Sequence, residues 1–93
     1  MENYNRIEKD DIAIQYFLND KLHRIDGPEK EWYSGSKSWY QNGKRHRING
    51  PAVEHADGYK EYWIEGTLYS KEEFDKKVAL LNNKAKMIII LVK

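Results

Sequence analysis

The sequence predicts an α+β fold: an antiparallel β-meander of tandem hairpin repeats, forming a single-layer sheet, with a C-terminal α-helix packed on one face. Three observations predict it: a segment that recurs 23 positions further along the chain, glycine turns between short alternating stretches, and a helix-capping motif at Ser70. A chain of 93 residues holds one hydrophobic core. We therefore expect a single domain over 1–93, divided into a polar N-terminal segment (1–11), hairpin repeats (12–69), a helix (70–86) and an apolar tail (87–93).

The repeat appears as two copies of one segment. Asn19 to Pro28, with the sequence NDKLHRIDGP, returns 23 positions later as Asn42 to Pro51, NGKRHRINGP. Three aromatic pairs keep the same offset: Tyr16-Phe17, Trp39-Tyr40 and Tyr62-Trp63. An internal period of this length is typical of repeat architectures.

The turns between the predicted strands follow from glycine. Asn42-Gly43 favours a two-residue type I′ hairpin turn, because both central positions need a positive φ. Asp57-Gly58 is expected to form a second such turn, and Ser34-Gly35 its weaker counterpart. Pro28 and Pro51 cannot donate to a ladder, so they mark strand starts or bulges.

A helix is predicted after the repeats. Ser70-Lys71-Glu72-Glu73 is a capping box, in which the serine hydroxyl and the Glu73 carboxylate satisfy each other's backbone N–H groups. Phe74, Val78 and Leu81 then form one apolar stripe. We expect a helix from about Lys71 to Asn82 or somewhat beyond.

The tail from Met87 to Val92 is the longest apolar run. Its β-branched residues favour a strand that pairs with a sheet edge or with another copy of the chain, and a continued helix is the alternative. The run is far shorter than the ~20 residues that span a bilayer, and residues 1–11 are too polar for a signal peptide. We expect a cytoplasmic protein with no membrane partner.

The repeat resembles a known family. The period of 23 positions and the element Asn42-Gly43-Lys44-Arg45-His46, followed by a strand and Asp57-Gly58, resemble MORN-type repeats. The variant with His-Arg-x-Asp-Gly-Pro, seen in phage and large-virus proteins, is the closer match, over roughly residues 12 to 69. The resemblance implies a single-layer sheet of successive hairpins and a role in protein–protein contacts.

Alternation places the paired rings on opposite faces of the sheet. Tyr16, Trp39 and Tyr62 form one column, whose aliphatic neighbours assign it to the core beneath the helix. The second column then lies largely in solvent, where it serves as an interface or only stiffens the sheet through cross-strand pairs. A reversal of the two faces is the third alternative. The second column comprises Phe17, Tyr40 and Trp63.

The remaining candidates are basic residues and positions that differ between the units. His-Arg occurs at the same place in both copies, which favours a structural role over the binding of a phosphate or an acidic partner. Positions that differ, such as Arg45 against Leu22, are better suited to choosing a partner. The residues predicted to bind a partner are Phe17, Tyr40, Trp63, Trp32, Tyr33, Arg45, Arg47 and Lys44.

The composition narrows the function. The chain has no cysteine and a net charge of only +1, and it lacks the spacing of a metal site, a phosphate loop or a nucleophile elbow. We expect no catalytic residue, metal or cofactor. The leading hypothesis is a non-enzymatic protein-binding module, a phage accessory protein that inhibits a host-defence protein in the manner of an anti-CRISPR protein. The alternative is a nucleic-acid or small-nucleotide binder, and a homodimer through residues 87–92 or a sheet edge is a further option.

Overall fold

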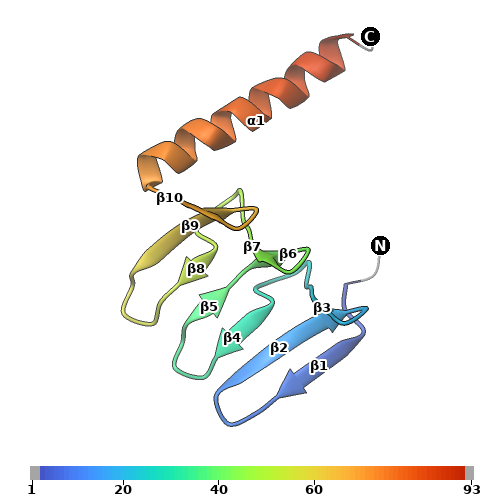
Figure 1. Cartoon of the computed structure of the whole chain (residues 1–93), viewed down its shortest axis with the longest axis vertical. Coiled ribbons are helices and arrows are strands. Elements are labelled where there is room, and N and C mark those ends of the chain that lie inside the picture. Colours follow the sequence, from blue (N-terminus) through green and yellow to red (C-terminus); the bar gives the residue numbers. More distant parts are fainter. Residues whose placement is uncertain (1–2, 92–93) are drawn as a thin grey trace.

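The computed structural model describes the backbone of residues 3–91 and the side chains of residues 3–83. Ten short strands precede one helix (Figure 1). In chain order they are β1 (Arg6–Lys9), β2 (Ala13–Leu18), β3 (Lys21–Leu22), β4 (Lys30–Trp32), β5 (Lys37–Ser38), β6 (Tyr40–Gln41), β7 (Lys44–Arg45), β8 (Val53–Glu54), β9 (Lys60–Ile64), β10 (Thr67–Tyr69) and α1 (Lys71–Leu91).

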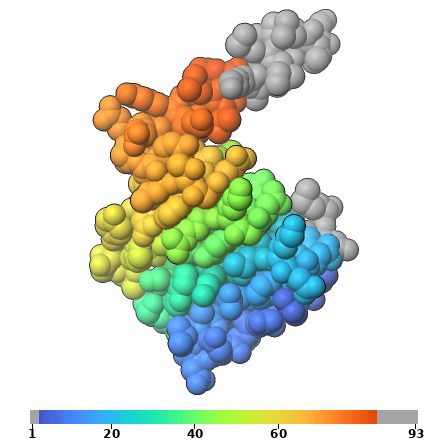
Figure 2. Space-filling model, in the orientation of Figure 1, coloured from blue at the N-terminus to red at the C-terminus, as the bar shows by residue number. Residues whose placement is uncertain are grey.

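The strands form an open antiparallel meander. The main sheet has the order β1-β2-β4-β5-β8-β9-β10, with β3 also paired to β2, while β6 and β7 form a two-stranded sheet of their own. Successive hairpins follow one another from the N-terminus toward the helix, as the bands of colour in Figure 2 show. The predicted α+β class, an open meander with a C-terminal helix packed against it, is confirmed.

The strand register assigns side chains to two faces. Gln15 lies opposite Lys30, Lys30 opposite Ser38, Ser38 opposite Val53, and Val53 opposite Glu61, so these residues share one face. The alternation within β2 and β9 adds Phe17 and Trp63 to it; we call it the open face. The residues between them lie on the other side with the helix, which we call the helix face. Tyr16 and Tyr62 are among its members.

Three two-residue turns recur at the interval of the repeat. Asn42 and Gly43 have φ values of 53° and 78°, which a type I′ turn requires, so the prediction at this position is confirmed. Glu65-Gly66 (48° and 82°) and Asn19-Asp20 (50° and 66°) adopt the same conformation one repeat interval to either side. The turn therefore recurs at the interval of the repeat even at Glu65-Gly66, where a glutamate replaces the asparagine.

The turns at Ser34-Gly35 and Asp57-Gly58 differ from the expectation. Only their glycines have positive φ, 105° and 95°. In the first, the N–H of Gly35 donates to the Trp32 carbonyl at 3.0 Å and the N–H of Trp32 donates to the Ser36 carbonyl at 2.9 Å. This pattern closes a three-residue loop that ends in a left-handed glycine, and the type I′ prediction is wrong for both sites.

An arginine on the helix face fixes each loop between units. The guanidinium carbon of Arg24 lies 4.0 Å from the centre of the Tyr16 ring, and that of Arg47 lies 3.8 Å from the centre of the Trp39 ring. Arg47 donates to the Asn49 side chain at 3.2 Å, to the Pro51 carbonyl at 3.0 Å and to Glu54 at 3.2 Å. Arg24 makes the equivalent bonds to Asp26, Pro28 and Glu31. The recurring arginines are thus parts of the shared scaffold.

The glycine before each proline makes this arrangement possible. A Cβ on Gly27 or Gly50 would lie 2.9 Å from the guanidinium carbon of Arg24 or Arg47. Each guanidinium therefore lies between an aromatic ring and a glycine backbone, and the repeated Gly-Pro serves close approach rather than a positive φ.

The helix covers the third aromatic ring of the helix face, Tyr62, as Arg24 and Arg47 cover the first two. Phe74, only 5% exposed, packs on Tyr62 with ring centres 4.9 Å apart. The capping box forms as predicted, since the Glu73 N–H donates to the Ser70 hydroxyl and the Ser70 N–H donates to the Glu73 carboxylate, both at 3.1 Å. Val78 is half-buried, whereas Leu81 is 39% exposed. The helix then runs beyond the β10 end of the sheet (Figure 1).

Two expectations change as a result. The helix covers Tyr62 but not Tyr16 and Trp39, whose rings lie beneath Arg24 and Arg47 instead. The backbone of residues 87–91 continues the helix, which decides between the two alternatives for the tail. The predicted pairing of that segment with a sheet edge or with another copy of the chain concerns side chains outside the described residues. Among the described residues, no helix has the length and apolar character needed to cross a lipid bilayer.

Candidate binding site on the open face

Four of the residues predicted to bind a partner meet around Arg45. Tyr40 lies directly opposite Arg45 in the β6–β7 hairpin. The Arg45 guanidinium carbon lies 5.1 Å from the centre of the Trp63 ring. Trp32 and Arg45 also line a common pocket, although they are 13 positions apart in the sequence. All four side chains are half-buried, so the rings are neither sealed in a core nor fully exposed.

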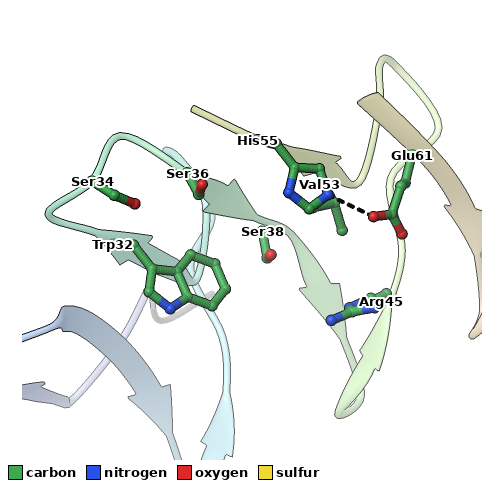
Figure 3. Close-up of a pocket in the computed structure, with 8 residues that line it drawn as sticks. All are labelled: Trp32, Ser34, Ser36, Ser38, Arg45, Val53, His55 and Glu61. Atoms are coloured by element: carbon green, nitrogen blue, oxygen red, sulfur yellow. Dashed lines mark hydrogen bonds and ion pairs between the residues drawn. The ribbon is translucent and has the colours of Figure 1, made fainter. Parts of the chain in front are cut away.

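The pocket has a volume of about 230 Å³, and its lining residues come from β4, β5, β7, β8 and β9 and the loops beside them (Figure 3). Trp32 lies on one side of it and Arg45 on the other, with Ser38 between them. We call it the Arg45 pocket. Its lining residues are Trp32, Ser34, Ser36, Ser38, Arg45, Val53, His55 and Glu61.

Glu61 is the carboxylate of this pocket, and both of its oxygens are engaged. One accepts from the Trp63 indole N–H at 2.9 Å, and the other lies 2.6 Å from Nε2 of His55. The hydrogen bond from His55 is the main reason that the pKa of Glu61 is held below its ordinary value, and the bond from Trp63 and the charge of Arg45 act in the same direction. Glu61 is therefore ionised at neutral pH and serves to hold two neighbouring side chains.

Two cations lie at the pocket: Arg45 lines it, and Lys30 lies over the ring of Trp32, which is one of its lining residues. Arg45 and Lys30 make no ion pair with any described side chain, and each lies against an indole ring instead. Lys30 places its Nζ 4.6 Å from the centre of the Trp32 ring and lies opposite Ser38 in the ladder. Cation–π contacts orient these groups while leaving their hydrogen-bond donors free for a ligand.

Ser38 is the deepest polar group in the pocket. The residue is 0% exposed, and its hydroxyl has no hydrogen-bond partner among the described residues. Serine, histidine and glutamate thus line one pocket, but Ser38 is not hydrogen-bonded to His55, so the nucleophile–base contact of a hydrolase is not formed. No group of three potential metal ligands occurs among the described residues.

The other predicted residues lie elsewhere. Phe17 is on the open face but at the β1–β2 end, with the Arg6 guanidinium carbon 4.4 Å from its ring centre. Tyr33 is 58% exposed on the β4–β5 loop. Lys44 packs its stem against Gly66, and Arg47 is held on the helix face by the bonds described above.

Sequence reasoning did not select Ser38, His55 or Glu61 as site residues. His55 and Glu61 flank the Asp57-Gly58 turn, so pairing across that hairpin was a signal that they share a face. Ser38 carried no such signal, because its burial depends on the pairing of β5 with both β4 and β8.

A second polar group is buried at the junction between the first two units. Glu29 is 3% exposed, at the repeat position that Ala52 holds in the second unit. Burial raises the pKa of Glu29 to about 7, against the lowering effect of the Tyr40 N–H.

Backbone hydrogen bonds also join β7 to the β9–β10 hairpin. The Gly66 N–H donates to the Arg45 carbonyl at 2.9 Å, and the Arg47 N–H donates to the Trp63 carbonyl at 3.1 Å.

Comparison of the chain with protein-family models, with curated proteins and with solved structures finds no match. The resemblance to MORN-type repeats therefore stays a prediction, and the function is inferred from the chain itself.

Proposed function

We propose that this chain is a non-enzymatic protein-binding module, and that it binds its partner through the open face around Arg45. The observation that carries the proposal is that Tyr40, Trp63 and Trp32 lie close to Arg45, whose guanidinium makes no ion pair with a described side chain. The helix packs on the opposite face, where Phe74 lies against Tyr62. Tyrosine, tryptophan and arginine are the residue types that contribute most to protein–protein binding energy.

The internal contacts of the two faces support the choice of face. On the helix face, the guanidinium groups of Arg24 and Arg47 already donate hydrogen bonds to the loops that follow them. Phe74 covers Tyr62 on the same face. On the open face, Arg45 and Lys30 are oriented by rings and bonded to no described acceptor. A partner that supplies acceptors there gains charge-assisted hydrogen bonds without breaking any in the free protein.

The resemblance to phage repeat proteins extends the proposal to a host protein, including one of a defence system, as the partner. That extension rests on analogy between repeat proteins.

The test compares captured partners between folded variants. The double variant Trp63→Ala, Tyr40→Ala is used as bait in lysate of a candidate host, beside the wild type, and captured proteins are quantified by mass spectrometry. The expected result is one or a few proteins held by the wild type and depleted about tenfold or more with the variant, since hot-spot aromatic residues typically contribute ~2 kcal/mol or more. A control is Ile25→Ala, which removes an apolar side chain that is 56% exposed and does not line the pocket.

Unchanged capture by the double variant would contradict the proposal. Thermal unfolding of each bait is followed by circular dichroism, so that loss of the fold is distinguished from loss of the interface. If the double variant is unfolded, the milder pair Trp63→Phe and Tyr40→Leu repeats the comparison.

Nucleic acid is the second candidate, because rings beside unpaired cations also suit single-stranded bases. Arg45 over Trp63 and Lys30 over Trp32 are the specific observations that favour it. Binding of this kind weakens steeply with salt, by about one log–log unit per phosphate contact. Fluorescence anisotropy of a labelled oligonucleotide, repeated over a range of salt concentrations, separates the two candidates.

A further inference from the structure

We propose that the Arg45 pocket receives a carboxylate side chain, an aspartate or glutamate, from an extended segment of the partner protein. This inference rests on the proposed function and names the chemistry that the pocket selects.

Size is the first reason. A pocket of about 230 Å³ is smaller than the roughly 300–1,000 Å³ typical of sites for whole small molecules. It can hold one amino-acid side chain. The neighbouring half-buried rings of Tyr40 and Trp63 would contact the flanking residues of the same segment.

Charge is the second reason. Arg45 and Lys30 are cations with no ion pair to a described side chain, whereas the single carboxylate of the pocket, Glu61, already has a partner on each oxygen. A basic side chain from a partner would meet the like charge of Arg45 in the pocket and that of Lys30 beside it, and each oxygen of Glu61 already accepts one hydrogen bond. An acidic one would meet a free guanidinium, whose planar fork matches a carboxylate.

Ser38 supplies the third reason. Its hydroxyl lines the pocket, is completely buried and has no hydrogen-bond partner in the described part of the chain, which is an unfavourable state for a polar group. A carboxylate oxygen is the acceptor that this O–H needs. Because the hydroxyl has no accessible surface in the present arrangement, a carboxylate reaches it only after a lining side chain has moved. Trp32, half-buried beside Ser38, is the side chain placed to do so (Figure 3).

The experiment uses the full chain labelled with ¹⁵N and two blocked pentapeptides, Thr-Val-Glu-Val-Thr and Thr-Val-Gln-Val-Thr. These differ only in the charge of the central residue. The expected result is that the glutamate peptide shifts the indole N–H of Trp32 and the Nε–H of Arg45 in a saturable way. The glutamine peptide should bind about tenfold more weakly, since it replaces a charge-assisted hydrogen bond by a neutral one.

Variants locate the effect. Arg45→Gln should lose most of the preference for the glutamate peptide, because it removes the guanidinium and leaves only Lys30 and Ser38. The matched control is Arg6→Gln, which removes a cation that also lies over a ring of the open face, that of Phe17, but outside the pocket. Arg6→Gln should leave the tenfold preference intact. Ser38→Ala should reduce the preference without unfolding the protein, since it removes an unsatisfied buried hydroxyl.

Three outcomes would overturn the carboxylate site: equal binding of both peptides by the wild type, no shift at the pocket resonances, or an oligonucleotide that shifts them at far lower concentration than the glutamate peptide. The first two outcomes would not contradict the proposed protein-binding function, which is tested separately by capture with the Trp63 and Tyr40 variants. The third assigns the pocket to nucleic acid.

Discussion

The guanidinium carbon of Arg47 lies 2.9 Å from the point that a Cβ on Gly50 would occupy. The same relationship, with the same distance, joins Arg24 and Gly27 one unit earlier. Each arginine also lies over an aromatic ring and donates to the loop that follows it. One residue thus connects a strand, a loop and the next hairpin, and the stability of the ribbon should depend on it.

Gly50→Ala should destabilise the protein by about 1–3 kcal/mol, because the new methyl group displaces the Arg47 guanidinium from its bonds with Pro51 and Glu54. Chemical denaturation measures the change. In a background of Arg47→Ala the same substitution should cost much less, since the group it strikes is gone. Additive effects of the two substitutions would show that the contact does not limit stability.

Glu29→Gln should stabilise the protein at about pH 8 and have little effect at low pH. Because burial raises the pKa of Glu29 to about 7, the folded state binds this proton more tightly than the unfolded chain does. The free energy of unfolding therefore falls as the pH rises from the ordinary value of 4.5 to about 7, by on the order of 3 kcal/mol. The variant cannot ionise and escapes this loss.

Denaturation of the Glu29→Gln variant and the wild type between about pH 4 and pH 8 gives the comparison. Glu65→Gln, at an exposed position, is the control and should follow the wild type. Parallel curves for wild type and Glu29→Gln would refute the raised pKa.

Ser70→Ala should lower stability by about 1 kcal/mol, because the Glu73 N–H loses its acceptor at the start of α1. The loss should appear as fraying of the helix by circular dichroism before the sheet unfolds. Thr67→Ala, an exposed position in β10, serves as the comparison. Equal effects of the two substitutions would mean that the cap does not hold the helix.

The indole N–H of Trp63 should report the ionisation of Glu61. It donates to this carboxylate, whose pKa is held below 4.5 mainly by the hydrogen bond from His55. As the pH falls through that lowered pKa, the carboxylate gains a proton and its stabilising contribution is lost. The ¹⁵N–¹H signal of Trp63 should therefore move as Glu61 gains its proton, at a pH below the ordinary glutamate pKa of 4.5. Movement that is complete by pH 5 would contradict this assignment.

The sequence predicts local features of this fold better than features set by long-range register. The turn at Asn42-Gly43 and the capping box at Ser70 were predictable because each depends on a few neighbouring residues. Asp57-Gly58 was misassigned because a glycine after Asp suits both a two-residue turn and a three-residue loop, and the pairing of the flanking strands decides between them.

In the candidate site, too, the local features were predictable and those set by long-range strand pairing were not. The rings at Tyr40 and Trp63 were identified from the repeat, since they keep its offset. The placement of Trp32 and Arg45 around one pocket was not predictable, because it depends on the pairing of Lys37 in β5 with Glu54 in β8. The arrangement of Arg24 over Tyr16 also has no sequence pattern of its own, because the two residues belong to different segments of the unit.

In the third unit Phe74 takes the place over the ring that an arginine holds in the first two. The contact that ends the repeat array, made by Phe74, is therefore different from the arginine contact that joins successive units. Duplication of the coding region for one unit would lengthen the ribbon by one hairpin pair and leave its closing helix intact. Such proteins can grow by copying, each added unit bringing a fresh set of open-face side chains for new specificity to evolve.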